Sequence, residues 1–126
     1  MTTLNEIKSI HIMNYSALIE GIGEAFKHIK VCVDNLKYEE TKELWNDILL
    51  AFLQIAYSHT IIIEIFADNP VLVKRFEQFE EVLEATELFA HEVDSKSGQI
   101  ICDKIYPVFL VWKEQIDHEL LPYYIN

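Results

Sequence analysis

Apolar side chains recur every three or four residues through four stretches of this chain, a spacing typical of helices that bury one stripe. The clearest pattern covers residues 70–93, whose apolar seam consists of Leu72, Phe76, Phe79, Leu83, Thr86, Ala90 and Val93. Because the steps alternate between four and three, these side chains stay on one side of a helix and can face a partner helix. The chain therefore has to bury one stripe per helix, which favours helices packed against one another.

The other three stretches follow the same rule and end at recognisable signals. They cover residues 16–35, 40–67 and 101–120. Asn69 can cap the helix that follows it, with Pro70 in the first turn, and Pro122 ends the last stretch. Four helices with short connections predict an all-α fold, an up-and-down antiparallel four-helix bundle. No break in composition divides residues 1–126, so we expect a single domain.

Two segments fall outside this pattern. Residues 1–13 carry isoleucines in loose alternation with polar residues. They fit either a short extended arm or the frayed first turn of the first helix. Residues 94–98 read Asp-Ser-Lys-Ser-Gly, which predicts a polar loop between the third and fourth helices.

Gly21, Gly23 and Pro107 lie inside predicted helices, where these residue types are unfavourable. We expect the two glycines to mark either the close approach of another helix or a bend that shapes a groove. Pro107 removes the backbone hydrogen bond to Asp103, which predicts a kinked fourth helix. If that helix began at Tyr106 instead, Pro107 would lie in its first turn without cost. The apolar spacing before the proline favours the kink.

The composition excludes several classes of protein. The chain has 21 acidic and 10 basic residues and a net charge of −11, which repels phosphate and argues against a nucleic-acid partner. Its 51% hydrophobic content excludes intrinsic disorder, and its two cysteines exclude a disulfide scaffold. The first residues lack the features of a secretory signal, and the apolar runs are too short to span a bilayer. We therefore expect a cytoplasmic protein that does not contact a membrane.

The chain carries few signs of catalysis or metal binding. The nearest pairs to a dimetal motif are Glu24 with His28 and Glu87 with His91. Both pairs are spaced by four residues, whereas dimetal bundles use a spacing of three, so we interpret them as surface residues. Cys32 and Cys102 lie among apolar neighbours, which predicts buried thiols. With no phosphate-binding loop or nucleophile motif, we expect no enzymatic activity, no metal and no cofactor.

His59 differs from the other histidines because it lies on the apolar stripe of the second helix. The simplest interpretation is a neutral imidazole that is hydrogen-bonded to a carbonyl, a hydroxyl or a tyrosine. The alternative is a ligand contact or a pH-sensitive latch, since an imidazole titrates near neutral pH.

Two features indicate a protein partner. A ridge of glutamates lies on the side of the third helix away from its seam and consists of Glu77, Glu80, Glu81, Glu84 and Glu87. This ridge could attract a basic partner, or it could be a solvated face. In addition, residues 61–66 and 108–112 hold more consecutive apolar side chains than a helix can turn inward, so we assign Tyr106, Phe109 and Trp112 to a partner-binding surface. A homodimer through the second and fourth helices, or an amphipathic segment of another protein, would cover it.

Two short motifs resemble those of small helical-bundle proteins from Gram-positive bacteria. The first is Leu18-Ile19-Glu20-Gly21-Ile22, and the second is Asp103-x-x-x-Pro107 followed by Trp112-Lys113. In size, acidity and helix order the chain is also similar to flagellar and other secretion chaperones. That resemblance implies a protein that holds the amphipathic helix of an export substrate in the cytoplasm.

These features favour a non-enzymatic protein-binding module of the chaperone or adaptor type, whose partner is another protein or a second copy. One alternative is an acidic inhibitor or immunity-type protein that blocks a basic site on its partner. Another is an enzyme or sensor that uses His59 in a cavity of the bundle.

Overall fold

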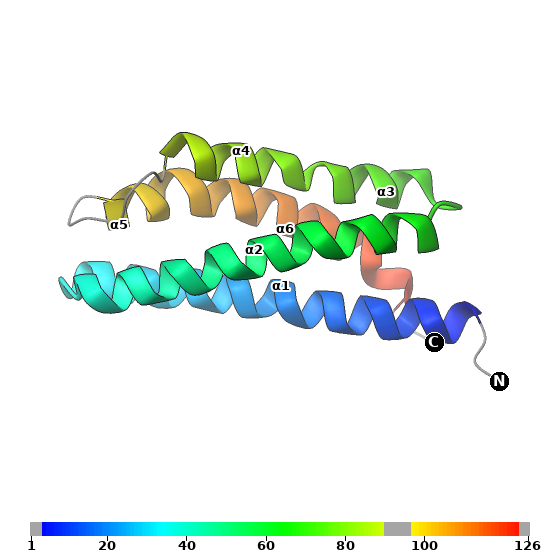
Figure 1. Cartoon of the computed structure of the whole chain (residues 1–126), viewed down its shortest axis with the longest axis horizontal. Helices are drawn as coiled ribbons and strands as arrows, with labels where there is room; N and C mark the ends of the chain where they lie inside the picture. The colour runs from blue at the N-terminus through cyan, green and yellow to red at the C-terminus, as the bar shows by residue number, and fades with distance from the viewer. Residues whose placement is uncertain (1–3, 90–96, 124–126) are drawn as a thin grey trace.

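The computed structural model describes residues 4–89 and 97–123, and every regular element within these ranges is helical (Figure 1). The elements are α1 (Leu4–Asp34), α2 (Tyr38–Ile65), α3 (Pro70–Glu77), α4 (Phe79–Phe89), α5 (Ser97–Ile100), a π-helical turn (Ile101–Ile105), α6 (Tyr106–Leu120) and a 3₁₀ turn (Leu121–Tyr123). The prediction of an all-α fold is confirmed.

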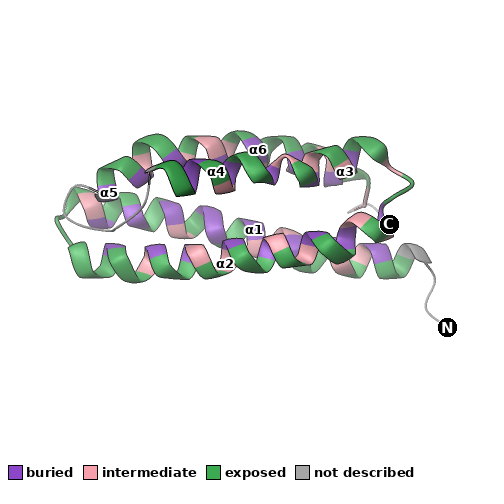
Figure 2. Cartoon of the chain, turned by 45° about the horizontal axis from the view of Figure 1, so that its top comes forward, coloured by how far each residue is buried: buried purple, intermediate pink, exposed green. Residues whose placement is uncertain are grey.

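The helices form two layers. In the first layer α1 and α2 lie side by side along most of their length (Figure 1). In the second layer α3 and α4 run end to end beside α6. The layers meet where α6 contacts α1 and α3 contacts α2. Figure 2 shows the buried residues concentrated on the sides of the helices that face the other layer.

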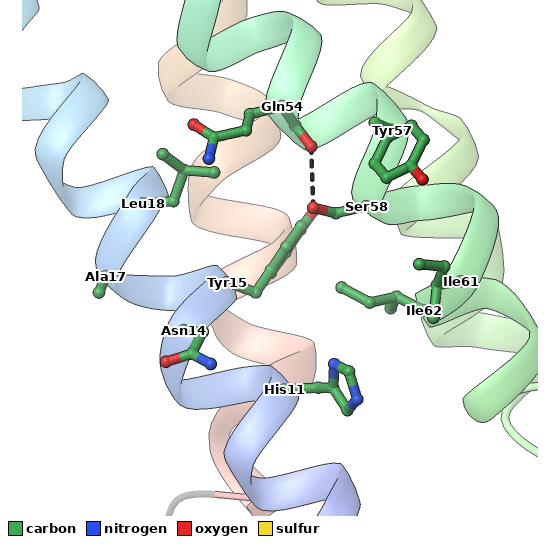
Figure 3. Close-up of a pocket in the computed structure, with 10 residues that line it drawn as sticks. All are labelled: His11, Asn14, Tyr15, Ala17, Leu18, Gln54, Tyr57, Ser58, Ile61 and Ile62. Atoms are coloured by element: carbon green, nitrogen blue, oxygen red, sulfur yellow. Dashed lines mark hydrogen bonds between the residues drawn. The ribbon is translucent and has the colours of Figure 1, made fainter.

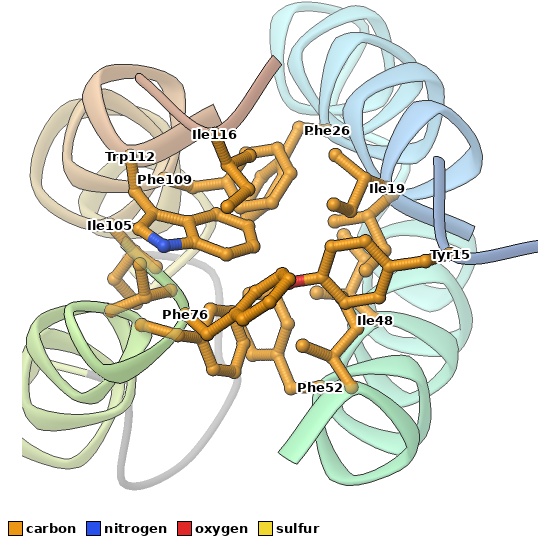
Figure 4. Close-up of a cluster of buried hydrophobic side chains, with 14 of the residues drawn as sticks. Tyr15, Ile19, Phe26, Ile48, Phe52, Phe76, Ile105, Phe109, Trp112 and Ile116 are labelled. Carbon is orange, nitrogen blue, oxygen red and sulfur yellow. The ribbon is translucent and has the colours of Figure 1, made fainter. Parts of the chain in front are cut away.

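Aromatic rings from three helices meet at the centre of the core (Figure 4). The ring centroids are 6.2 Å apart for Phe26 and Phe52, 5.2 Å for Phe26 and Phe109, and 6.1 Å for Phe52 and Phe109. The same core cluster contains fully buried isoleucines along the length of the helices, among them Ile12, Ile19, Ile29, Ile48, Ile55, Ile105 and Ile116. Since burying one such side chain stabilises a fold by about 1.5–3 kcal/mol, this cluster is the main source of stability.

Helix α1 begins at Leu4, about three turns before the expected start near Ser16. The ammonium group of Lys8 is largely buried, and Nζ donates to both carboxylate oxygens of Asp68 at 3.1 Å. It also lies 5.3 Å from the ring centroid of Phe66. The hydrogen bond from Lys8 lowers the pKa of the Asp68 carboxyl group. Residues 4–13 are therefore part of α1 and not an extended arm, whereas residues 1–3 of the predicted segment lie outside the described residues.

The turn between α1 and α2 is a Schellman motif, in which the two amides after the helix return to its last turn. Lys37 N–H donates to the backbone oxygen of Cys32 at 2.8 Å, and Leu36 N–H donates to that of Val33 at 3.1 Å. Leu36 has a φ of 57°, in the left-handed region that favours glycine. The motif sets the first turn of α2 beside the last turns of α1.

Replacing Leu36 with glycine is expected to raise the free energy of unfolding by about 1 kcal/mol, because glycine adopts this φ without steric cost. The leucine side chain is 69% exposed, so little packing is lost. Leu53→Gly is the matched control, since Leu53 is 66% exposed but lies inside α2, where glycine should cost about 1 kcal/mol. Urea unfolding of both variants measures the effect. A fall in stability for both variants would contradict the prediction.

The segment after α2 confirms one prediction and corrects another. Asn69 caps α3, with its side-chain oxygen accepting from Leu72 N–H at 3.2 Å and Pro70 in the first turn, as expected. The expected single third helix is divided at Gln78 into α3 and α4. Beyond this break the predicted seam residues Phe79 and Thr86 are buried, but Val82 is fully buried in place of Leu83, which is only partly buried. The predicted seam residues Ala90 and Val93 lie outside the described residues.

A π-helical turn precedes the proline of the fourth helical stretch. The N–H of Tyr106 donates to the backbone oxygen of Ile101, five residues earlier. The wider turn makes room for the ring of Pro107, which would otherwise clash with the carbonyl of Asp103. The sequence pattern favours a kink at Pro107, but the structure has the alternative. Helix α6 starts at Tyr106, and Pro107 lies in its first turn. Residues 94–96 of the predicted loop lie outside the described residues, whereas Ser97 begins α5.

The two glycines of α1 do not mark a close approach between helices. A Cβ atom built on Gly21 meets nothing within 4 Å, and one on Gly23 lies 3.7 Å from the side chain of Lys113, an ordinary contact. Helix α1 continues through both residues. The close approach occurs at Gly98, where a Cβ atom would lie 2.7 Å from Cγ2 of Val33.

Candidate functional site

Helix α2 carries apolar side chains on both of its faces. The inner face buries Thr41, Trp45, Ile48, Phe52, Ile55, His59 and Ile62. The outer face exposes Leu50, Leu53, Tyr57 and Ile61, whose exposed fractions are 65%, 66%, 71% and 46%. Their spacing of three and four residues makes one stripe on the solvent side, which we call the outer stripe of α2. Exposed apolar patches of this kind mark sites of interaction.

A cleft of ≈ 610 Å³ opens beside the outer stripe, between α1 and α2 (Figure 3). Its α1 wall consists of His11, Asn14, Tyr15, Ala17 and Leu18, and its α2 wall of Gln54, Tyr57, Ser58, Ile61 and Ile62. Tyr57 and Ile61 belong to both the cleft and the outer stripe. The cleft therefore extends the exposed apolar surface inward.

A second hollow of ≈ 210 Å³ continues the cleft along the same two helices. The two hollows share Ala17 and Leu18, and the second also contains Gly21, Ala25 and Ala51. These small side chains leave the space between the helices open. From residue 11 to residue 25 of α1 the two hollows extend about 21 Å, and we call them together the α1–α2 groove.

The groove is largely uncharged and has a negative end. Three of its polar side chains, Asn14, Gln54 and Ser58, carry no charge, and Ser58 Oγ donates to the backbone oxygen of Gln54 at 2.8 Å (Figure 3). Asp47 lines the end nearer the α1–α2 turn, and the exposed Glu43 lies one helical turn before it. A ligand of this groove would present an apolar face, with positive charge favoured at that end.

The predicted partner-binding residues of the fourth helix lie inside the protein. Phe109 is fully buried, and Trp112 is 3% exposed. Tyr106 is half-buried and stacks on Phe26 with a centroid distance of 4.8 Å. The expected exposure of Phe109 and Trp112 is therefore wrong. Among the consecutive apolar residues of α6, Val111 faces solvent, with 58% of its surface exposed.

All five glutamates of the predicted acidic ridge are exposed, on α3 for Glu77 and on α4 for Glu80, Glu81, Glu84 and Glu87. The ridge and the α1–α2 groove belong to different layers of the molecule, and no residue lines both. The ridge and the groove therefore do not form one site. Of the two halves of the predicted partner surface, Glu81 of the ridge and Trp112 of the fourth helix do line a common hollow between α4 and α6.

His59 is buried in an aromatic environment. Its Nε2 lies 2.6 Å from the hydroxyl of Tyr15, and the rings of Phe76 and Phe79 lie 5.4 and 5.5 Å from the imidazole. Burial lowers the pKa of His59 to about 4. Burial and the charge of Asp117 raise the pKa of Tyr15. The predicted neutral imidazole bonded to a tyrosine is confirmed, and such a group does not titrate near neutral pH.

Three side chains that can ligate a metal ion lie together beside the turn that joins α1 and α2. The sequence alone did not predict this cluster. Its members are His28, Cys32 and Glu40, and one ligand atom of each lies within 4.8 Å of the other two. The Cys32 thiol is buried and lies 3.6 Å from Oε2 of Glu40, and burial and this carboxylate raise the thiol's pKa. Glu24, the predicted neighbour of His28, pairs with Lys27 at 3.2 Å instead.

The signal for this cluster was present in the sequence. A histidine and a cysteine spaced by four residues share one face of a helix, and a carboxylate follows directly after the turn. Only the geometry of the turn shows that the carboxylate returns to that face. Cys102, the second predicted buried thiol, is half-buried.

One described helix, α2, is long and apolar enough to cross a membrane by length and composition alone. Its apolar character comes from the two faces described above, one in the core and one toward solvent. The outer stripe is therefore the part of the apolar surface of α2 that stays exposed to solvent in the folded protein.

No significant match to the chain was found among curated proteins or among solved structures. One family model, described as a domain of unknown function (DUF8042), matches residues 11–115, which include the groove, the acidic ridge and the cluster of His28, Cys32 and Glu40. Because the match covers most of the 126 residues, the chain belongs to this DUF8042 family.

Proposed function

We propose that this protein is a non-enzymatic binding module that holds an amphipathic helix of a partner protein in the α1–α2 groove. One observation carries the proposal, which is that the outer stripe of α2 exposes four large apolar side chains, of which Tyr57 and Ile61 line the groove. Laying the apolar face of a helix into an apolar groove is a recurrent mode of peptide recognition. A chaperone or adaptor works by this kind of contact.

The dimensions of the groove suit a helix. About 14 residues of helix match its length of about 21 Å. The small side chains Ala17, Gly21 and Ala25 leave space for the side chains of a docked helix, as in ridges-into-grooves packing. Tyr57 and Ile61 supply a large contact area at the edge, and tyrosines are frequent among the residues that dominate binding energy.

Charge favours a partner of different chemistry over a second copy. Each chain carries a net charge of −11, so two copies repel each other. A helix with lysines or arginines beside its apolar face is attracted instead, most strongly near Asp47 and Glu43. We therefore take a basic amphipathic helix as the occupant. The homodimer predicted from the sequence is the competing occupant that the test separates.

The scaffold in this proposal is an up-and-down antiparallel four-helix bundle. Its third member consists of α3 and α4, and its fourth consists of α5, the π turn and α6. The tight Schellman turn and the end-to-end arrangement of α3 and α4 support this assignment.

We propose a cytoplasmic location without membrane contact. Seven residues of α2 pack into the core, and a membrane-spanning α2 would withdraw all of them. A cytoplasmic module that holds a helix of another protein would act as flagellar and secretion chaperones do, in keeping with the resemblance noted above.

A second candidate function rests on the acidic ridge. Its five exposed glutamates could block a basic site on another protein, as an inhibitor or immunity-type protein would. Binding at this ridge would leave the α1–α2 groove empty. Variants of the two surfaces therefore separate the two functions.

The test uses a synthetic helical peptide of about 14 residues with leucines on one face and lysines on the other. We expect fluorescence anisotropy to detect its binding to the full chain and Tyr57→Glu to weaken the affinity at least about tenfold, because a charge enters an apolar contact. Gly21→Leu should weaken it as well by filling the groove. Gly21 is an exposed helical position, so this variant does not disturb the core.

The controls decide between the surfaces. Val111→Glu alters a valine of α6 that is 58% exposed, so it should leave binding unchanged. Loss of binding in Glu81→Lys but not in Tyr57→Glu would favour the acidic ridge instead. A stable dimer in light scattering that Tyr57→Glu dissociates would identify a second copy as the occupant. Binding that survives both groove variants would overturn the proposal.

A further inference from the structure

The end of α1 and the start of α2 bring together three side chains of kinds that commonly bind metal ions in proteins. His28 and Cys32 are four residues apart on α1, so they point to the same side, one above the other. The Schellman turn then reverses the chain within three residues, which sets Glu40, in the first turn of α2, against Cys32. The three ligand atoms lie within 4.8 Å of one another.

The spacing of these atoms is close to that of a tetrahedral zinc site. Zinc bonds of about 2.3 Å to sulfur and about 2.0 Å to oxygen place the two ligand atoms about 3.5 Å apart. Sγ of Cys32 and Oε2 of Glu40 are 3.6 Å apart. The pairs that include the His28 nitrogen need about 3.3–3.6 Å in such a site. The side chains of His28 and Glu40 are exposed, so rotation about their χ angles can close this gap.

The chemistry of the three groups selects the kind of metal. A thiolate and a carboxylate together neutralise a divalent cation, and the imidazole ligates without charge. Thiolate and imidazole favour zinc over magnesium or calcium, which prefer oxygen ligands. Lys37, the cation that faces the thiol, carries one positive charge against these two negative ones. On binding, Cys32 releases its thiol proton to solvent, and its sulfur bonds the metal.

We propose that His28, Cys32 and Glu40 form a zinc site with one coordination position open to water. Three protein ligands and an open position are typical of zinc sites that bind a further ligand. The metal would also join the end of α1 to the start of α2. This site is separate from the α1–α2 groove, since none of its residues lines the two hollows.

Cobalt(II) is the probe, because it occupies zinc sites and reports a bound thiolate through a charge-transfer absorption band. We expect the reduced full chain to bind one equivalent of cobalt with this band and with the visible bands of a tetrahedral ion. Zinc should displace the cobalt. Zinc at a hundredfold excess over its Kd should raise the Tm by about 10 °C.

Three variants test the ligands one at a time. Cys32→Ser should abolish the charge-transfer band, and His28→Ala and Glu40→Gln should each weaken zinc binding more than about tenfold. The last two variants change exposed side chains, so they leave the core intact.

Cys102→Ser and His118→Gln are the matched controls, since both residues lie outside the cluster, and they should leave cobalt and zinc binding unchanged. A charge-transfer band that persists in Cys32→Ser, or its absence from the unaltered protein, would overturn the proposal. Zinc affinity that is equal in Glu40→Gln and in the unaltered chain would remove Glu40 from the site.

Discussion

Phe109→Ala is expected to lower the free energy of unfolding by about 3–5 kcal/mol, the cost of removing a buried aromatic ring and leaving a cavity. Phe109 is fully buried and contacts the rings of Phe26, Phe52 and Trp112, at centroid distances of 5.2, 6.1 and 6.1 Å. These rings come from α1, α2 and α6, so the loss affects three helices at once. Urea unfolding followed by circular dichroism measures it. Phe109→Asp should abolish folding, because the desolvation cost of a buried, unpaired carboxylate adds to the free energy lost with the aromatic ring.

Val111 supplies the control for this prediction. It lies on the same helix, two residues away, and is 58% exposed, so Val111→Ala should change the free energy of unfolding by less than about 0.5 kcal/mol. If Phe109→Asp kept the helical spectrum and the stability of the unaltered chain, Phe109 would lie on the surface. The partner-binding surface predicted on the fourth helix would then be restored.

Local features of the fold could be predicted from the sequence. The cap at Asn69 with Pro70 depends on residues within one turn, and the structure contains it as expected. The apolar stripe of α2 depends only on periodicity, and His59 occupies its inward position. These features need no knowledge of what packs against the helix. Local chemistry and spacing were therefore sufficient for them.

Features that depend on a shift of the helical period could not be predicted. Apolar spacing alone favours Val108 as the core residue after Ile105, yet Phe109 holds that position. The π turn at Ile101–Ile105 holds more than four residues per turn, so Phe109 takes the core position after Ile105, whereas Trp112, Ile116 and Leu120 are buried as the spacing predicts. After the break at Gln78 the seam changes in the opposite direction, since Val82 rather than Leu83 is fully buried. Both shifts arise where the chain departs from an uninterrupted α-helix.

The candidate sites depend on how separate helices are placed. The groove exists because small residues of α1 face Ala51 of α2, and the order of residues in one helix does not show which part of the other lies opposite. The surplus of apolar residues in the second helix was visible in the sequence, but its division between core and solvent was not. The cluster of His28, Cys32 and Glu40 likewise requires the geometry of the turn.

The stability of the protein is expected to fall as the pH is lowered from about 6.5 to about 4, through the titration of His59. Its pKa is 6.5 in the unfolded chain and about 4 in the folded protein, because burial disfavours the charged imidazole. Between these values the unfolded state binds the proton and the folded state does not, so unfolding is favoured as the pH falls. The difference of about 2.5 pKa units corresponds to about 3 kcal/mol, and the imidazole is only 8% exposed, so little of it is lost to solvent screening.

Comparison with His59→Gln isolates this contribution from that of the carboxylates. The variant loses some packing at every pH, but its side-chain amide can still bond the hydroxyl of Tyr15 and does not titrate. Between pH 7 and pH 4.5 we expect urea unfolding to show a loss about 2.5 kcal/mol larger in the unaltered protein than in the variant. His118→Gln, which removes an exposed imidazole, should follow the unaltered protein. Equal losses in His59→Gln and the unaltered chain would mean that the folded protein accepts a proton at His59 as readily as the unfolded chain does.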